Sequence, residues 1–143
     1  MLIHQISVFV ENKQGRLREV MDVIAGAGID IRALSLADTS DFGILRMIVD
    51  DPGKAAALFR ENGIMASVTE VIAAELDDKP GALAHVLSVL AGVDISVEYI
   101  YAFITRRDQN AYVILRVEDN EAAAGALTKA NISLLSPDEI YSI

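Results

Sequence analysis

An internal repeat constrains the fold of this chain more than any other feature of its sequence. The segment ENKQGRLREVMDVIA, which starts at Glu11, matches DDKPGALAHVLSVLA, which starts at Asp77, in glycine position and apolar spacing. The same order of matches continues along the chain. The further matching segments are 28–31 with 92–95 (GIDI and GVDI), and 43–64 with 111–132, which align without a gap.

The spacing of these matches defines two copies of one domain. In this alignment the second copy is two residues shorter before GVDI and four residues longer before Ala111. No linker rich in Pro, Gly or Ser separates the copies, so we expect them to pack side by side. We predict two domains, residues 1–68 and residues 69–143.

Each copy has the pattern of strand, helix, strand, strand, helix and strand. Ile6, Val8 and Val10 alternate with their neighbours, which is the period of a strand. The helix that follows has one apolar face in each copy. These faces are Leu17, Val20, Met21 and Ile24 in the first copy, and Leu83, Val86, Leu87 and Leu90 in the second.

Capping residues mark the helix boundaries. Asp51 and Asp119 have the place of N-caps for the second helix of each copy, and Pro52 suits a first helical position. Gly26 and Gly28 in the first copy, and Gly92 alone in the second, have the place of residues that end the first helix. We expect final strands from about Met65 and Ser133 and a turn over 106–110, with Arg106 and Arg107 in solvent.

The order of these elements predicts an α+β fold. Two tandem βαββαβ domains, each with an antiparallel sheet and helices on one face, would form ferredoxin-like sandwiches. The other face of each sheet is apolar as well, because Ile44, Ile48, Tyr112 and Ile114 point away from the helices. A contiguous apolar patch marks an interface. We expect a homodimer, and the alternative is that the two copies cover each other within one chain.

Composition excludes several classes of function. The chain has 12 Lys and Arg against 21 Asp and Glu, a net charge of −9, which disfavours nucleic acid as a partner. It has no cysteine, so thiol chemistry and zinc fingers are excluded. No apolar stretch reaches the ~20 residues that span a bilayer, and the N-terminus does not read as a signal peptide. We therefore expect a cytoplasmic protein with no membrane partner.

Candidate chemical groups outside the repeat are few. His4 and His85 are the two histidines, and neither has a second histidine at ligand spacing, so we expect no metal. Tyr99, Tyr101 and Phe103 alternate on one strand. In an acidic chain they indicate core or dimer contacts and not base stacking. No Ser, His and Asp constellation is recognisable, and we expect no cofactor and no catalysis.

The loop between the first strand and the first helix of each copy carries the most informative residues. A helix start presents unpaired N–H groups that suit a carboxylate, and Gly15 or Gly81 lets a ligand come close. Asn12 and Asp78 can accept a hydrogen bond from an ammonium group. Each loop therefore offers groups for both ends of an amino acid. The alternative is that these residues only form a turn and cap the helix.

The loop DKPGAL, the GVDI strand start and the two βαββαβ units resemble the ACT domain family along nearly the whole chain. This resemblance is nearest to free-standing proteins made of two ACT domains, which are regulatory modules that sense amino acids. It implies that ligands lie between neighbouring domains, where a strand-to-helix loop of one meets the start of the second strand of another. The residues so implied are Asn12, Gly15, Arg16, Leu17, Ile29, Asp30, Ile31, Asp78, Lys79, Pro80, Gly81, Ala82, Leu83, Val93, Asp94 and Ile95.

The first loop departs from the family pattern, because Gln14 stands where the proline is expected. We expect a non-catalytic regulatory protein that binds an amino acid or a similar small zwitterion and acts allosterically on a metabolic enzyme. Two alternatives are a dimerisation scaffold without a ligand and a small enzyme on the same fold. An enzyme of the acylphosphatase type would need a phosphate-binding loop that this sequence lacks.

Overall fold

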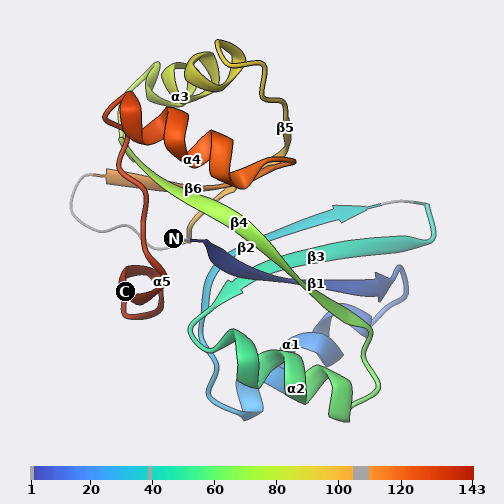
Figure 1. Cartoon of the computed structure of the whole chain (residues 1–143). Helices are drawn as coiled ribbons and strands as arrows, with labels where there is room; N and C mark the ends of the chain where they lie inside the picture. Colours follow the sequence, from blue (N-terminus) through green and yellow to red (C-terminus); the bar gives the residue numbers. More distant parts are fainter. Residues whose placement is uncertain (1, 39, 105–109) are drawn as a thin grey trace.

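One six-stranded antiparallel sheet runs through the whole chain, with the order β2-β3-β1-β4-β6-β5 (Figure 1). The computed structural model describes residues 2–38, 40–104 and 110–143, so the predicted position of Arg106 and Arg107 lies outside it. The elements are β1 (Ile3–Glu11), α1 (Arg16–Gly26), β2 (Ile31–Asp38), β3 (Phe42–Val49), α2 (Pro52–Glu61), β4 (Ala66–Asp77), α3 (Ala82–Ala91), β5 (Val97–Ala102), β6 (Asn110–Val117), α4 (Asn120–Lys129) and α5 (Pro137–Tyr141).

Strand β4 belongs to both copies of the repeat. Its first half, from Ala66 to Val71, pairs with β1, and its second half, from Ile72 to Asp77, pairs with β6. We call β1, α1, β2, β3, α2 and the first half of β4 the first unit. The second half of β4 with α3, β5, β6 and α4 is the second unit. The first unit shows the predicted βαββαβ pattern, and the second shows βαββα with its last strand reduced to a bridge. The last strand of the first copy and the first strand of the second are continuous in β4.

Side-chain caps begin the second helix of each unit, as predicted. The Asp51 carboxylate accepts a hydrogen bond from the Lys54 N–H at 3.1 Å, and the Asp119 carboxylate accepts one from the Ala122 N–H at 3.0 Å. Each bond satisfies one of the amide groups that a helix start leaves free. Within the described residues, no helix has both the length and the hydropathy needed to cross a bilayer.

The first helices of the two units end on different residue types. After α1 the left-handed residue is Gly28, with φ of 72°, and after α3 it is Asp94, with φ of 58°. The N–H groups that follow, of Ile29 and Ile95, bond back into their helices at 3.0 and 2.9 Å. Gly28 therefore corresponds to Asp94, and the alignment of GIDI with GVDI is wrong by two residues. Aspartate tolerates the left-handed region better than most residues, so this turn does not need the glycine by which it would be recognised in the sequence.

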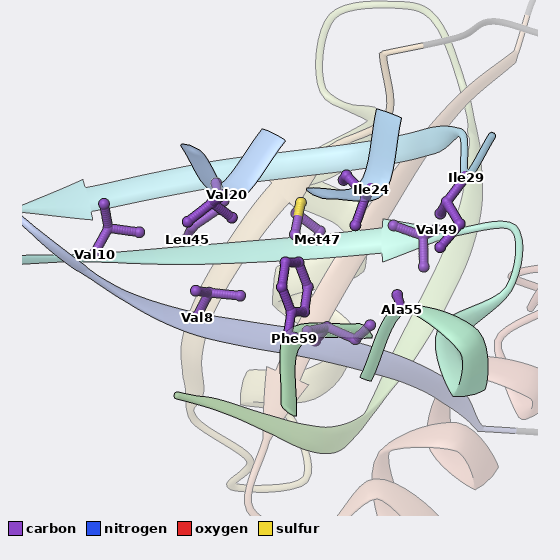
Figure 2. Close-up of a cluster of buried hydrophobic side chains, with 11 residues drawn as sticks. Val8, Val10, Val20, Ile24, Ile29, Leu45, Met47, Val49, Ala55 and Phe59 are labelled. Carbon is purple, nitrogen blue, oxygen red and sulfur yellow. The ribbon is translucent and has the colours of Figure 1, made fainter. Parts of the chain in front are cut away.

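Two apolar cores lie between the sheet and its helices. Figure 2 shows the first, in which side chains of α1 and α2 meet those of β1 and β3, with the Phe59 ring at its centre. The second core joins α3 and α4 to β4 and β6 in the same way, around Ile72, Leu90 and Leu115. The fully buried residues of these cores follow the predicted apolar periodicity, whereas Leu17, Leu83 and Leu87, predicted on the same helix faces, are exposed.

A third core fills the space between the open faces of the two units. Ile48, Tyr112 and Ile114, predicted to point away from the helices, are buried in it together with Ile3 and Val71. The edges of the sheet also meet, because β2 and β5 come within contact and Ala33 forms a bridge with Phe103. The sheet is thus rolled, and for these residues the two copies cover each other within one chain.

The C-terminal segment closes the third core and was not predicted correctly. The expected last strand is reduced to a single bridge between Ala74 and Leu134, and the short helix α5 follows. The Arg32 guanidinium, mostly buried, donates hydrogen bonds to the carbonyl groups of Ile140 at 3.3 Å and Tyr141 at 3.0 Å. Arg32 therefore fastens α5 to β2 of the first unit.

A polar group links the two units inside the roll. The fully buried Gln5 amide accepts a hydrogen bond from the Tyr101 hydroxyl at 2.6 Å and donates one to the Tyr99 hydroxyl at 2.7 Å. Burial raises the pKa of the Tyr101 hydroxyl far above its ordinary value, so this group stays a donor. The Arg46 guanidinium lies 3.8 Å from the centre of the Tyr99 ring. The alternating tyrosines are thus core residues of the single chain.

The third core makes a prediction about cooperativity. Ile114→Ala should lower the free energy of unfolding by about 2–5 kcal/mol, because it leaves a cavity where side chains of both units meet. Urea unfolding followed by circular dichroism and tyrosine fluorescence should still show one transition. The exposed Ile104→Ala variant should change the free energy by less than about 0.5 kcal/mol. Two separate transitions, with only one shifted, would show that the units do not share a core.

Candidate functional site

A cavity lies beside the strand-to-helix loop in each unit. The second-unit cavity, about 600 Å³, lies between the end of β4, the start of α3 and the turn after α4. The first-unit cavity, about 400 Å³, lies between the end of β1, the start of α1 and the turn after α2. The two turns correspond, because Gly63 and Asn131 both have a left-handed backbone. The repeat has therefore produced two cavities at the same place in the fold.

A left-handed glycine precedes the first helix of each unit. Gly15 has φ of 85° and Gly81 has φ of 89°, and neither helix start has a side-chain cap. A Cβ built on either glycine would meet no atom within 4 Å. Backbone conformation and not crowding therefore selects glycine here. The uncapped start leaves first-turn N–H groups and the positive end of the helix dipole facing outward.

Polar side chains from several elements line the second-unit cavity. The Glu75 carboxylate on β4 accepts a hydrogen bond from the Asn110 amide at the start of β6. Asp77 forms an ion pair with Lys79 at 3.3 Å. Further polar lining residues are His85 on α3, Asn131 and Ser133. The cavity therefore combines carboxylate acceptors on one wall with a helix start on another.

Apolar side chains line the corresponding wall of the first-unit cavity. Phe9 and Phe42 are both 48 % exposed and Met65 is 71 % exposed, and all three line this cavity. Large apolar side chains exposed beside polar ones are typical of an interaction surface, and here they replace the polar wall of the second-unit cavity.

The charged groups of the first-unit cavity are already paired. Arg16 forms an ion pair with Glu19 at 3.0 Å, and Glu11 forms one with Lys13 at 3.0 Å. The hydrogen bond that Arg16 donates to the Glu19 carboxylate raises the pKa of Arg16. The hydrogen bond from Lys13, helped by the charges of Lys13 and Arg16, lowers the pKa of Glu11. These groups are fully exposed, so the pairs add little to stability.

Some of the predicted loop residues line these cavities. Lys79, Pro80, Gly81 and Ala82 line the second-unit cavity, and Arg16 lines the first. Among the described residues, the lining of these two cavities does not include Asn12, Gly15, Leu17, Asp78 or Leu83. The acceptor that the sequence suggested, Asp78, is thus replaced at the cavity wall by its neighbour Asp77.

The predicted strand starts lie at the far ends of α1 and α3 from the loops. Asp94 and Ile95 line another cavity, of about 620 Å³, together with Glu98 and Asp119. In the first unit, Asp30 forms an ion pair with Arg32, and its N–H donates to the Asp50 carboxylate at 3.1 Å. Ile29 is buried, Ile31 is half-buried and Val93 is exposed. One chain therefore does not bring a loop and a strand start into one site.

Several polar cavity residues were missed in the sequence. Glu75, Asn110, His85 and Asn131 come from four separate elements, so no local motif marks them. One signal was present at the end of β4, where an apolar strand finishes in Glu75-Leu76-Asp77 directly before the loop.

Comparison with known proteins agrees with this architecture. The sequence profile described as ACT domain pair matches residues 1–143. The crystal structure of protein BT0572 from Bacteroides thetaiotaomicron is 36 % identical, with a TM-score of 0.93, over 100 % of this chain and 98 % of that one. The chain therefore belongs to the family of ACT domain pairs.

More distant relatives share the fold alone. The regulatory subunit of aspartate kinase from Thermus thermophilus, in its ligand-free form, is 17 % identical with a TM-score of 0.62, over 89 % of this chain and 91 % of that one. The corresponding subunit from Thermus flavus is 19 % identical with a TM-score of 0.61, over 92 % and 94 % of the two chains. A comparison with curated protein sequences returned no match.

The glycine before α3 makes a prediction about stability. Gly81→Ala should lower the free energy of unfolding by about 1–2 kcal/mol, because alanine is strained in the left-handed region although space is available. Gly125→Ala, within α4 and equally uncrowded, should instead raise it by about 0.5–1 kcal/mol. Urea titrations of the two variants measure both values. Equal effects of one sign would show that Gly81 does not need its left-handed backbone.

Proposed function

We propose that this protein is a non-catalytic regulatory protein that binds an amino acid or a similar small zwitterion. The observation that carries the proposal is the second-unit cavity, in which the Glu75 carboxylate and the uncapped start of α3 form separate walls. A zwitterion needs an acceptor for its ammonium group and donors for its carboxylate, a short distance apart. This cavity offers the acceptor in Glu75 and, for the carboxylate, the positive end of the α3 dipole.

Each end of the ligand has a physical partner in this site. The ammonium group would donate to Glu75, whose orientation is fixed by the Asn110 amide, and to Asp77. The carboxylate would lie beside the start of α3, where the helix dipole favours negative charge, although the Ala82 N–H already donates to the Lys79 carbonyl at 3.3 Å. Gly81 keeps this approach open, because it has no side chain. Lys79, at the rim, adds a positive charge on the same side.

We also propose that the complete site forms between two copies of the chain. Residues 78–83 of one copy would meet residues 93–95 of the other, since one chain keeps these segments at opposite ends of α3. Exposed apolar side chains support a partner on this side of α3, because Leu83, Leu87 and Val93 all remain in contact with water. A homodimer would cover them.

Regulation would follow from linkage. A ligand that binds one assembly or conformation more tightly shifts the population toward it and thereby changes affinity for a partner. The shared fold with regulatory subunits of aspartate kinase supports such a role, with a cytoplasmic metabolic enzyme as the partner. The two domains, residues 1–68 and 69–143, would divide the shared strand β4, which passes a change in one directly to the other.

A thermal-shift screen tests the proposal. Exhaustively dialysed protein is heated with each of the twenty amino acids, and a true ligand at 100 times its Kd should add about 2.7 kcal/mol to the free energy of unfolding. Gly81→Glu should remove the shift, because it places a carboxylate at the start of α3. Gly125→Ala should keep it. If no amino acid shifts the wild type and calorimetry agrees, a dimerisation scaffold explains the protein better.

A further inference from the structure

The two cavities have opposite chemistry at positions that correspond in the fold. Phe9 on β1 has the place of Glu75 on β4, since each lies two residues before its strand ends. At the start of the next paired strand, Phe42 has the place of Asn110, because Phe42 pairs with Glu11 and Asn110 pairs with Asp77. The acceptor for an ammonium group and the amide that orients it are thus both aromatic in the first unit.

The helix starts differ in the same direction. Glu19 lies in the first turn of α1. Its carboxylate interacts favourably with the positive end of the helix dipole and forms an ion pair with Arg16. At the place of Glu19, α3 has His85, and at the place of Arg16 it has Ala82. A ligand carboxylate would be repelled by Glu19 at the first helix and would meet no acid in the first turn of α3.

We infer that each chain binds one zwitterion, in the second-unit cavity, and that the first-unit cavity does not take it. Glu75 and Asn110 are the residues that set this difference. The inference rests on the proposed function, because it assigns that function to one of two cavities that the repeat placed at the same position in the fold. The duplication would thus have left a binding unit and a unit whose cavity has phenylalanines at the places of Glu75 and Asn110, while Glu11, Arg16 and Glu19 still line it.

Three separate differences between the two units bear on the same ligand. Loss of an acceptor at Phe9, loss of its orienting amide at Phe42 and gain of an acid at Glu19 all act against the same ligand. Glu11, at the place of Asp77, and Arg16 remain in the first-unit cavity, so the difference between the units lies at Phe9, Phe42 and Glu19. The backbone gives no such distinction, since Gly15 and Gly81 have the same conformation.

The number of ligands per chain tests the inference. Calorimetric titration of the wild type with the amino acid that gives the largest thermal shift should give one ligand per chain. A dimer with a site at each interface gives the same ratio. Two ligands per chain would overturn the inference and leave the proposed function standing, whereas no binding of any amino acid would overturn both.

A matched pair of variants assigns the single site to one unit. Gly81→Ala and Gly15→Ala introduce the same methyl group at the same backbone angles without a clash, so both should fold. Gly81→Ala should weaken binding about tenfold, and Gly15→Ala should change it less than about twofold. The reverse result, or equal losses, would place the ligand elsewhere.

The acceptor is tested separately. Glu75→Gln keeps the size of the side chain and removes its charge, and it should weaken binding about tenfold or more, since charge-assisted hydrogen bonds are the strong ones. Glu19→Gln, in the corresponding cavity, should leave the Kd unchanged. Unchanged binding by Glu75→Gln would contradict its role as the ammonium acceptor. Circular dichroism of each variant checks that the fold is kept.

Discussion

Burial of the open sheet faces against each other is the interaction on which the rest of this structure depends. Each unit covers one face of its sheet with helices and leaves the other face apolar. The third core buries both open faces at once, with Ile3, Ile48 and Ile114 fully excluded from water. Units this small are marginal when isolated, because too little of their surface is buried. Packing the two copies together removes that weakness in a chain that has no cysteine for disulfides.

The shared strand β4 makes this arrangement possible and also decides where the cavities lie. Because β1 and β4 are antiparallel, the loops that follow them emerge at opposite ends of the molecule (Figure 1). In the rolled sheet the open faces of the two units bury each other. The loops and the outer sides of the helices therefore stay accessible. Each cavity is therefore built from one unit, and a difference in one does not have to be matched in the other.

The repeat, the helix faces and the N-caps could be predicted because each depends on residues near one another in the sequence. Asp51 and Asp119 each accept a hydrogen bond from an N–H group three residues further along the chain. Val20 and Ile24 follow the period of a single helix. The fused strand β4 could not be predicted, since its two halves differ in which partner they meet and not in their composition. The same holds for α5, whose attachment depends on the distant Arg32.

The lining of the second-unit cavity could be predicted only in part for the same reason. The glycine at the start of α3 is a local signal, whereas Glu75 and Asn110 become neighbours only when β4 and β6 pair. Asp94 shows why aligning the two copies by residue identity misplaced the end of the first helix by two residues. The backbone preserved a left-handed residue there, and the sequence had exchanged glycine for aspartate.

The central claim is that the second unit binds the ligand and the first does not. Two-dimensional amide NMR of the wild-type protein tests it most directly, because Gly15 and Gly81 give separate signals from equivalent backbone positions. On titration with the amino acid found by the thermal-shift screen, the amides of Gly81, His85 and Asn131 should shift and saturate, while those of Gly15 and Gly63 stay in place. Equal shifts at both glycines, or shifts at Gly15 alone, would contradict the account.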